Sequence, residues 1–209
     1  MRIGDQGGAV SLAADVHRIV GDEQQSRPDD VGAGLESEQD DRRLHQGQQH
    51  HRNPGAPGDP GSPTINLPFP PGWQDAGNRT PAWAYAAILF SDPAMAQDPP
   101  TIIALVSRLT GNVDPAKILE FAPGEIKNLP GYEGAEEGNP STLGGFDATQ
   151  IGGGYTKDGV KRVIAQKTVV IPGQDGLYVL QLNADGTEDQ MGPLMDATSV
   201  IDEQTTITP

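Results

Sequence analysis

Histidine and cysteine are the residues that most often supply a general base near neutral pH or a zinc ligand. In this chain histidine occurs only near the start, where all four histidines precede Arg52, and cysteine is missing. His45, His50 and His51 lie in a tract rich in Gln and Gly, which we interpret as solvated chain in preference to a metal site. The sequence therefore predicts no catalytic residue, no metal ligand and no cofactor.

Two glycine-containing motifs resemble ligand-binding loops but lack a defining residue. Residues 152–157 have the glycines of a phosphate-binding loop without its Gly-Lys-Ser/Thr ending. We interpret them as a bulge at the end of a strand, before a hairpin. Residues 183–186 resemble part of a calcium loop, but Gly192 stands where a bidentate Glu is required. We interpret this second run as a turn from a strand to a helix.

Acidic and aromatic side chains are the remaining candidates. The adjacent acids Glu136–Glu137 and Glu188–Asp189 have the chemistry of a glycosidase pair. Adjacent side chains point in different directions, however, so solvated charge is the preferred interpretation. The aromatic residues that could line a cleft for sugar rings or an acyl chain are Trp73, Trp83, Tyr85 and Tyr155. Burial is the commoner role of large aromatics, which favours Trp83 and Tyr85 in the core and Trp73 capping the sheet. The sequence identifies no ligand-binding residue.

Composition separates a tail from a folded domain. Residues 1–61 contain no Phe, Tyr or Trp, and every such residue lies between Phe69 and Tyr178. A polar segment without large apolar side chains cannot offset the entropy of ordering. We therefore predict a disordered acidic tail rich in Gln, Gly and Pro over residues 1–61 and a folded domain over residues 62–209. The tail also lacks Lys, and one hypothesis is that it is not a native N-terminus.

The whole chain is acidic, with a formal net charge of −15 at pH 7. Lys and Arg form no basic stripe of the kind that phosphate backbones or anionic headgroups require, so we expect no nucleic-acid partner. Residues 1–25 lack the apolar centre of a signal peptide. The absence of cysteine argues against disulfides and a thioether-linked lipid anchor in the chain as written. No apolar stretch approaches the roughly 18 residues of a spanning helix.

Apolar periodicity predicts an α+β domain in which helices cover a central antiparallel sheet of about six strands. The expected strands are residues 65–69, 83–90, 101–110, 132–137, 145–155, 160–171 and 177–183, with a short one near Ile207. Asp158 and Gly159 predict a hairpin turn. Asp114 and Pro115 have the residue types that begin a helix, and Pro123 should kink or divide it. A closing helix over residues 188–203 has apolar positions at helical spacing: Met191, Leu194, Met195, Thr198 and Ile201.

Several of these segments also match a known family in order and spacing. They are Ile65–Pro68 with Pro71–Trp73, Thr101–Gly111 leading into Asp114–Ala116, Leu129–Tyr132, Leu143–Phe146 and the closing helix to Ile201. Together they resemble the LpqN family of mycobacterial cell-envelope lipoproteins and proline-rich antigens. The resemblance covers residues 65–207 and implies a PsbP-like α/β/α sandwich.

The resemblance also implies what the protein does. It implies a non-catalytic protein of the cell envelope or the extracellular space that binds an amphiphilic lipid, such as a trehalose-type glycolipid, in support of envelope biogenesis. An acyl chain would lie between sheet and helix, with the helix divided at Pro123 opening over it. The alternative is an interaction module that docks on an envelope protein or the secretion machinery without a small ligand. We expect a monomer, and an acid-based hydrolase ranks last because no carboxylates converge.

Overall fold

The structure is a computed structural model that describes residues 61–111, 113–174 and 176–209. The predicted tail, with its three candidate histidines, lies outside these residues apart from Gly61 and stays a prediction. The strands are β1 (Thr64–Asn66), β2 (Trp73–Asp75), β3 (Ala86–Phe90), β4 (Thr101–Leu109), β5 (Glu133–Gly134), β6 (Asn139–Leu143), β7 (Phe146–Lys157), β8 (Val160–Gly173), β9 (Gly176–Thr187) and β10 (Thr206–Thr208). The helices are α3 (Pro115–Phe121), α4 (Pro123–Lys127) and α5 (Met191–Gln204), with 3-10 turns η2 (Gly77–Arg79), η3 (Pro93–Met95) and η4 (Glu188–Gln190).

Most strands of the described part join one antiparallel sheet. This sheet has eight strands: seven pair in the order β2-β3-β4-β9-β8-β7-β5, and the eighth, β6, pairs with β7. β1 and β10 form a separate pair in which Ile65 lies opposite Ile207. The predicted α+β class and central antiparallel sheet are confirmed, but about six strands was too few. The missed strands are β2 and β6, with three and five residues, too few to show a period, and β6 contains Pro140, which only an edge strand tolerates.

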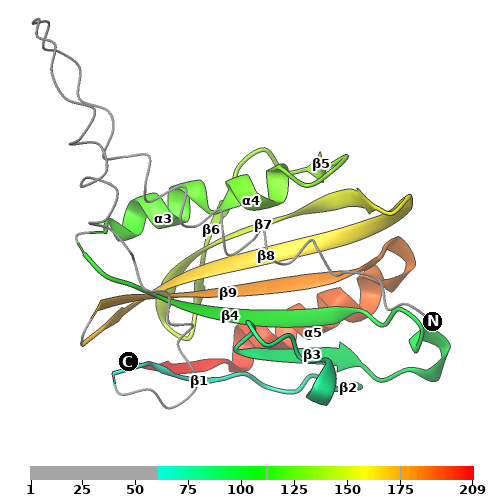
Figure 1. Cartoon of the computed structure of the whole chain (residues 1–209), viewed down its shortest axis with the longest axis horizontal. Helices are drawn as coiled ribbons and strands as arrows, with labels where there is room; N and C mark the ends of the chain where they lie inside the picture. The colour runs from blue at the N-terminus through cyan, green and yellow to red at the C-terminus, as the bar shows by residue number, and fades with distance from the viewer. Residues whose placement is uncertain (1–60, 112, 175) are drawn as a thin grey trace, which may run out of the picture. The chain divides into compact units, whose positions relative to one another are not determined.

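Helices cover both faces of this sheet, α3 and α4 on one side and α5 on the other (Figure 1). On β9 the alternation of side chains divides the two faces. Val179 packs with Ile118 of α3, whereas Tyr178 belongs to the larger core cluster that includes Leu194 of α5. We call these the α3/α4 face and the α5 face.

Local sequence signals explain most element boundaries. The Asp114 carboxylate accepts a hydrogen bond from the Ala116 amide at 2.9 Å and caps α3, which starts at Pro115 as predicted. Pro123 ends this helix and begins α4, so the predicted division is confirmed. The hairpin between β7 and β8 turns at Asp158 and Gly159, whose φ angles of 51° and 78° are those of the expected turn.

Three predictions of local structure were wrong. Residues 83–85 precede β3 because Pro81 starts a turn there, in which its carbonyl accepts from the Ala84 amide. Residues 152–154 form no bulge: β7 continues through them in regular register with β8. Residues 183–186 form no turn either, because β9 runs on to Thr187.

Among the described residues, no helix combines the length and the apolar character needed to cross a bilayer.

A close approach of two backbones explains why Gly153 is a glycine. β5 pairs with β7 there, and a Cβ on Gly153 would lie 2.7 Å from the Glu133 carbonyl oxygen and 2.9 Å from the Gly134 Cα. The neighbouring Gly154 has room, since its Cβ would meet nothing nearer than 3.6 Å. The two positions therefore form a matched pair.

We predict that Gly153→Ala lowers the free energy of unfolding by about 1–3 kcal/mol, the usual cost of overpacking. Gly154→Ala should be neutral or stabilising by up to about 1 kcal/mol, because glycine is unfavourable within a strand. Urea denaturation of both variants measures the difference. Equal midpoints would contradict the close approach.

Candidate functional site

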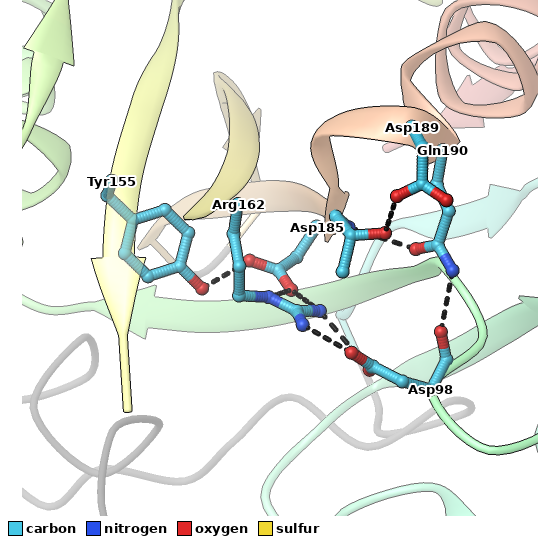
Figure 2. A network of polar contacts seen from close by, with 7 residues as sticks. Asp98, Tyr155, Arg162, Asp185, Asp189 and Gln190 are labelled. Carbon is cyan, nitrogen blue, oxygen red and sulfur yellow. Dashed lines mark hydrogen bonds and ion pairs between the residues drawn. The ribbon is translucent and has the colours of Figure 1, made fainter. Parts of the chain in front are cut away.

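A buried arginine on the α3/α4 face joins three strands and a loop. Arg162 of β8 donates from Nε and Nη2 to Asp185 Oδ1 of β9, at 2.8 and 2.5 Å, and from Nη1 to Asp98 Oδ2 at 2.6 Å. The hydroxyl of Tyr155, on β7, donates to Asp185 Oδ2 at 2.5 Å. Figure 2 shows the guanidinium lying between the two carboxylates. We call these four residues the Arg162 network.

The same network fixes the start of α5. Gln190 donates from Nε2 to the Asp98 carbonyl oxygen at 2.7 Å, and its Oε1 accepts from the Thr187 amide at 2.9 Å (Figure 2). This is a capping box, which satisfies amide groups that a helix start otherwise leaves without partners. The chain therefore enters α5 at a position set by the sheet.

The electrostatics of the Arg162 network favour a structural role over proton transfer. Burial, followed by the hydrogen bond to Asp185, raises the pKa of Tyr155 well above its ordinary value. Hydrogen bonds to Asp98 and Asp185 raise the pKa of Arg162, against the opposing effect of burial. The phenol stays protonated and the guanidinium stays charged, so the network stabilises the fold.

A second buried polar group lies beneath α4. The Glu125 carboxylate, 5% exposed, accepts from the side-chain amides of Gln166 and Gln181. Gln166 also donates to Asn183 Oδ1 at 3.1 Å. These contacts fill the space between α4 and the sheet. The hollows described next lie on the opposite face of the sheet, and the acyl-chain site expected beneath the divided helix stays a prediction.

The candidate site is a groove on the α5 face, between α5 and strands β7 to β9. It consists of two adjoining hollows of about 290 and 420 Å³, which share Ala165, Ala184 and Thr198. We call it the α5 groove. Its main lining residues are Gln150, Gly152, Gly154, Val163, Ala165, Lys167, Ala184, Met191, Leu194, Met195, Thr198, Ile201 and Asp202.

Small residues in register form the floor of this groove. Gly152 lies opposite Ala165, which lies opposite Ala184, so one row of glycine and alanine crosses three strands. Strand residues in a row share a face, and here that face has almost no side-chain volume. Ala165 is solvent-exposed although β8 lies inside the sheet. The hollow is thus a consequence of sequence and register.

The helical wall of the groove is apolar and open to solvent. The sequence predicted Met191 and Met195 on the inner face of the closing helix, but their side chains are 45% and 62% exposed. Only Leu194, Ala197 and Ile201 of α5 are buried. Flexible methionines are common on surfaces that adapt to varied apolar ligands.

Polar groups lie at both ends of the α5 groove. At one end Lys167, 8% exposed, donates to Asp202 Oδ1 at 2.6 Å, close to Gln150 and Asn139. At the other end Glu133, Lys161 and Glu188 contribute to the lining. An apolar trough with hydrogen-bonding groups at its ends is suited to an amphiphilic molecule.

The aromatic and acidic candidates do not form a cleft together. Trp73 is buried in edge strand β2 and packs on Phe90, with ring centroids 5.8 Å apart. Trp83 and Tyr85 are half-buried, and Tyr155 points to the α3/α4 face.

The acidic pairs are exposed in the structure. All four side chains of Glu136–Glu137 and Glu188–Asp189 are at the surface. Within the described part, no three His, Cys, Asp or Glu side chains are placed to hold a metal ion.

Comparison with known proteins identifies the family. The family model described as "Probable lipoprotein LpqN" matches residues 46–208. The chain belongs to the LpqN family. Lipoprotein LpqN of Mycobacterium tuberculosis is 54% identical to it over 171 residues, which are 81% of this chain and 71% of that protein.

A solved structure agrees with this family membership. A crystal structure of LpqN, described as involved in cell envelope biogenesis of M. tuberculosis, matches with a TM-score of 0.72 and 53% identity. The match covers 80% of this chain and 96% of that one. The predicted LpqN resemblance and fold class are both confirmed.

The raised pKa of Tyr155 gives a test of the Arg162 network. A folded-state pKa above the unfolded value of about 10 stabilises the fold below pH 10, and this contribution is lost as the pH rises further. We expect Tyr155→Phe to cost about 1–3 kcal/mol near neutral pH, because Asp185 loses a donor.

The difference between Tyr155→Phe and the parent should shrink above pH 10, where only the parent's unfolded state loses the Tyr155 proton. Urea unfolding across this pH range measures the difference. A difference that stays constant with pH would show that the buried phenol does not control it.

Proposed function

We propose that this protein is a non-catalytic cell-envelope protein that binds an amphiphilic lipid or glycolipid in the α5 groove. The observation that carries the proposal is the row of small residues, exposed at Ala165, beneath a partly exposed methionine wall. Burial of apolar surface would supply the affinity, since each methylene removed from water contributes about 0.8 kcal/mol.

The relatives support the cellular setting of the proposal. LpqN of M. tuberculosis is named a lipoprotein, and its crystal structure is described as that of a protein involved in cell envelope biogenesis. A lipid ligand and a location in the cell envelope or outside the cell would both be consistent with such a role.

The ionisable residues of the α5 groove favour ligand binding over catalysis. Its ionisable residues are Glu133, Lys161, Lys167, Glu188 and Asp202, of which Lys167 and Asp202 are paired with each other. The Lys167 ammonium is held by the Asp202 carboxylate at 2.6 Å, a contact that suits a structural or binding role. At the Met191 end, Glu133, Lys161 and Glu188 can donate to and accept from a hydroxyl-rich headgroup.

The alternative is docking on an envelope protein or secretion machinery without a small ligand. The exposed Met191 and Met195 fit this function too, because apolar surface patches also mark protein interfaces. Native mass spectrometry of the full chain, purified from its own host, separates the two functions. Co-purifying lipid supports the proposal, whereas a lipid-free mass and no thermal shift with trehalose glycolipids would favour docking.

A groove-filling substitution gives a sharper test. Ala165→Leu puts a larger side chain into the groove and adds little strain to the free protein, because Ala165 is exposed. It should weaken binding of a fluorescent trehalose glycolipid by about tenfold or more, the effect of about 1–3 kcal/mol of overpacking in the complex.

Ala116→Leu is the matched control, since Ala116 is exposed on α3, on the opposite face of the sheet. Fluorescence titration should give the parent affinity for this control. The groove is not the binding site if both variants bind like the parent.

A further inference from the structure

A separate hollow lies on the α5 face outside the α5 groove, on the side of β1 and β3. We call it the second hollow. Its volume is about 260 Å³. The side chains around it are mostly apolar: Ile65, Leu67, Phe69, Tyr85, Ala86, Ile88, Ile102, Ala104 and Ile201. Phe69 is 60% exposed, and the Tyr85 hydroxyl is directed to the Ile65 carbonyl oxygen at 3.5 Å. The polar side chains that contribute are few, so this hollow is suited to hydrocarbon.

Two isoleucines separate this hollow from the α5 groove. Ile102 of β4 and Ile201 of α5 line both spaces. Both are 3% exposed, so each space ends against the same two side chains. The two spaces are therefore neighbours beneath the C-terminal part of α5.

We propose that the second hollow takes the distal end of a long alkyl chain whose proximal part lies in the α5 groove. This inference rests on the proposed function and adds the ligand class: lipids with chains longer than the groove. From Met191 to Asp202 the groove follows about 17 Å of helix. A longer chain must return to water or turn beneath α5 past Ile201.

A chain that turns beneath α5 stays buried, which favours this path over a return to water. Each methylene that stays buried tightens binding by about fourfold. The affinity for single-chain lipids should therefore keep rising with length after the groove is full. A groove that ended at Ile201 would show a plateau instead.

Photo-crosslinking with the full-length protein tests this path. The probes are octyl and hexadecyl maltoside with a diazirine at the chain end, used below their micelle-forming concentrations. We expect the octyl probe to label the groove, at peptides that contain Met191 and Met195. The hexadecyl probe should label residues 64–69 and 85–88 around the second hollow.

Each other result has a distinct meaning. If both probes label only the groove, the extension is overturned and the proposed function stands. If the short probe also labels the second hollow, that hollow binds independently and the path past Ile201 is overturned. If neither probe labels the groove, the proposed function fails as well.

Ala86→Leu supplies a matched substitution, because Ala86 lines the second hollow and not the groove. It should lower the affinity for the hexadecyl probe by at least tenfold and leave the octyl probe unchanged, with Ala116→Leu again as control. An unchanged hexadecyl affinity would overturn the proposal. The crosslinking pattern needs no substitution, so it decides the matter even if the variant does not fold.

Discussion

The antiparallel register of β7, β8 and β9 is the constraint on which the rest of this structure depends. It places Gly152, Ala165 and Ala184 in one row on the α5 face, where they leave a hollow. The same strands direct Tyr155, Arg162 and Asp185 to the other face, where they form a buried ionic network. A shift of one residue in β8 would exchange the two faces. Arg162 would then face the α5 groove, and Ala165 would lie beneath α3 and α4. One pairing pattern therefore sets both the α5 groove and the buried polar contacts on the opposite face of the sheet.

Helix α5 is held at its two ends and packs one side of its length against the core. Gln190 ties its first turn to the loop before β4, and the Ile201 region packs against the core that includes Ile207. Between these points, few of its residues are buried, and the methionine side of the helix contacts solvent. A helix fixed in this way can border an open groove without collapsing onto the sheet. The sheet supplies the rigidity and the helix supplies an adaptable wall.

Much of the fold could be predicted because long elements have readable periods and distinct boundary residues. The alternation in β7 and β8, the Asp-Gly hairpin and the cap at Asp114 are local signals, and the structure follows them. The groove could not be predicted, because it arises from residues that are far apart in sequence and become neighbours only through pairing. A Gly-Gly-Gly run indicated a bulge, whereas its actual role depends on β5, which approaches closely, and on Ala165 in the adjacent strand. Periodicity placed Met191 and Met195 on the apolar face of the closing helix, but an apolar face gives no indication that the sheet beneath it lacks side-chain volume.

The pairing of β1 with β10 has a mechanical consequence. Thr64 at the start of β1 lies opposite Thr208 at the end of β10, so tension applied through these two residues loads the pair from one end. The backbone contacts would then break one after another, as in a zipper, and would not resist together as in shear. Because Ile65 and Asn66 border the second hollow, such peeling would unwrap that side of the molecule while the eight-stranded sheet stayed intact. Weak forces on these two strands would thereby open the second hollow to solvent.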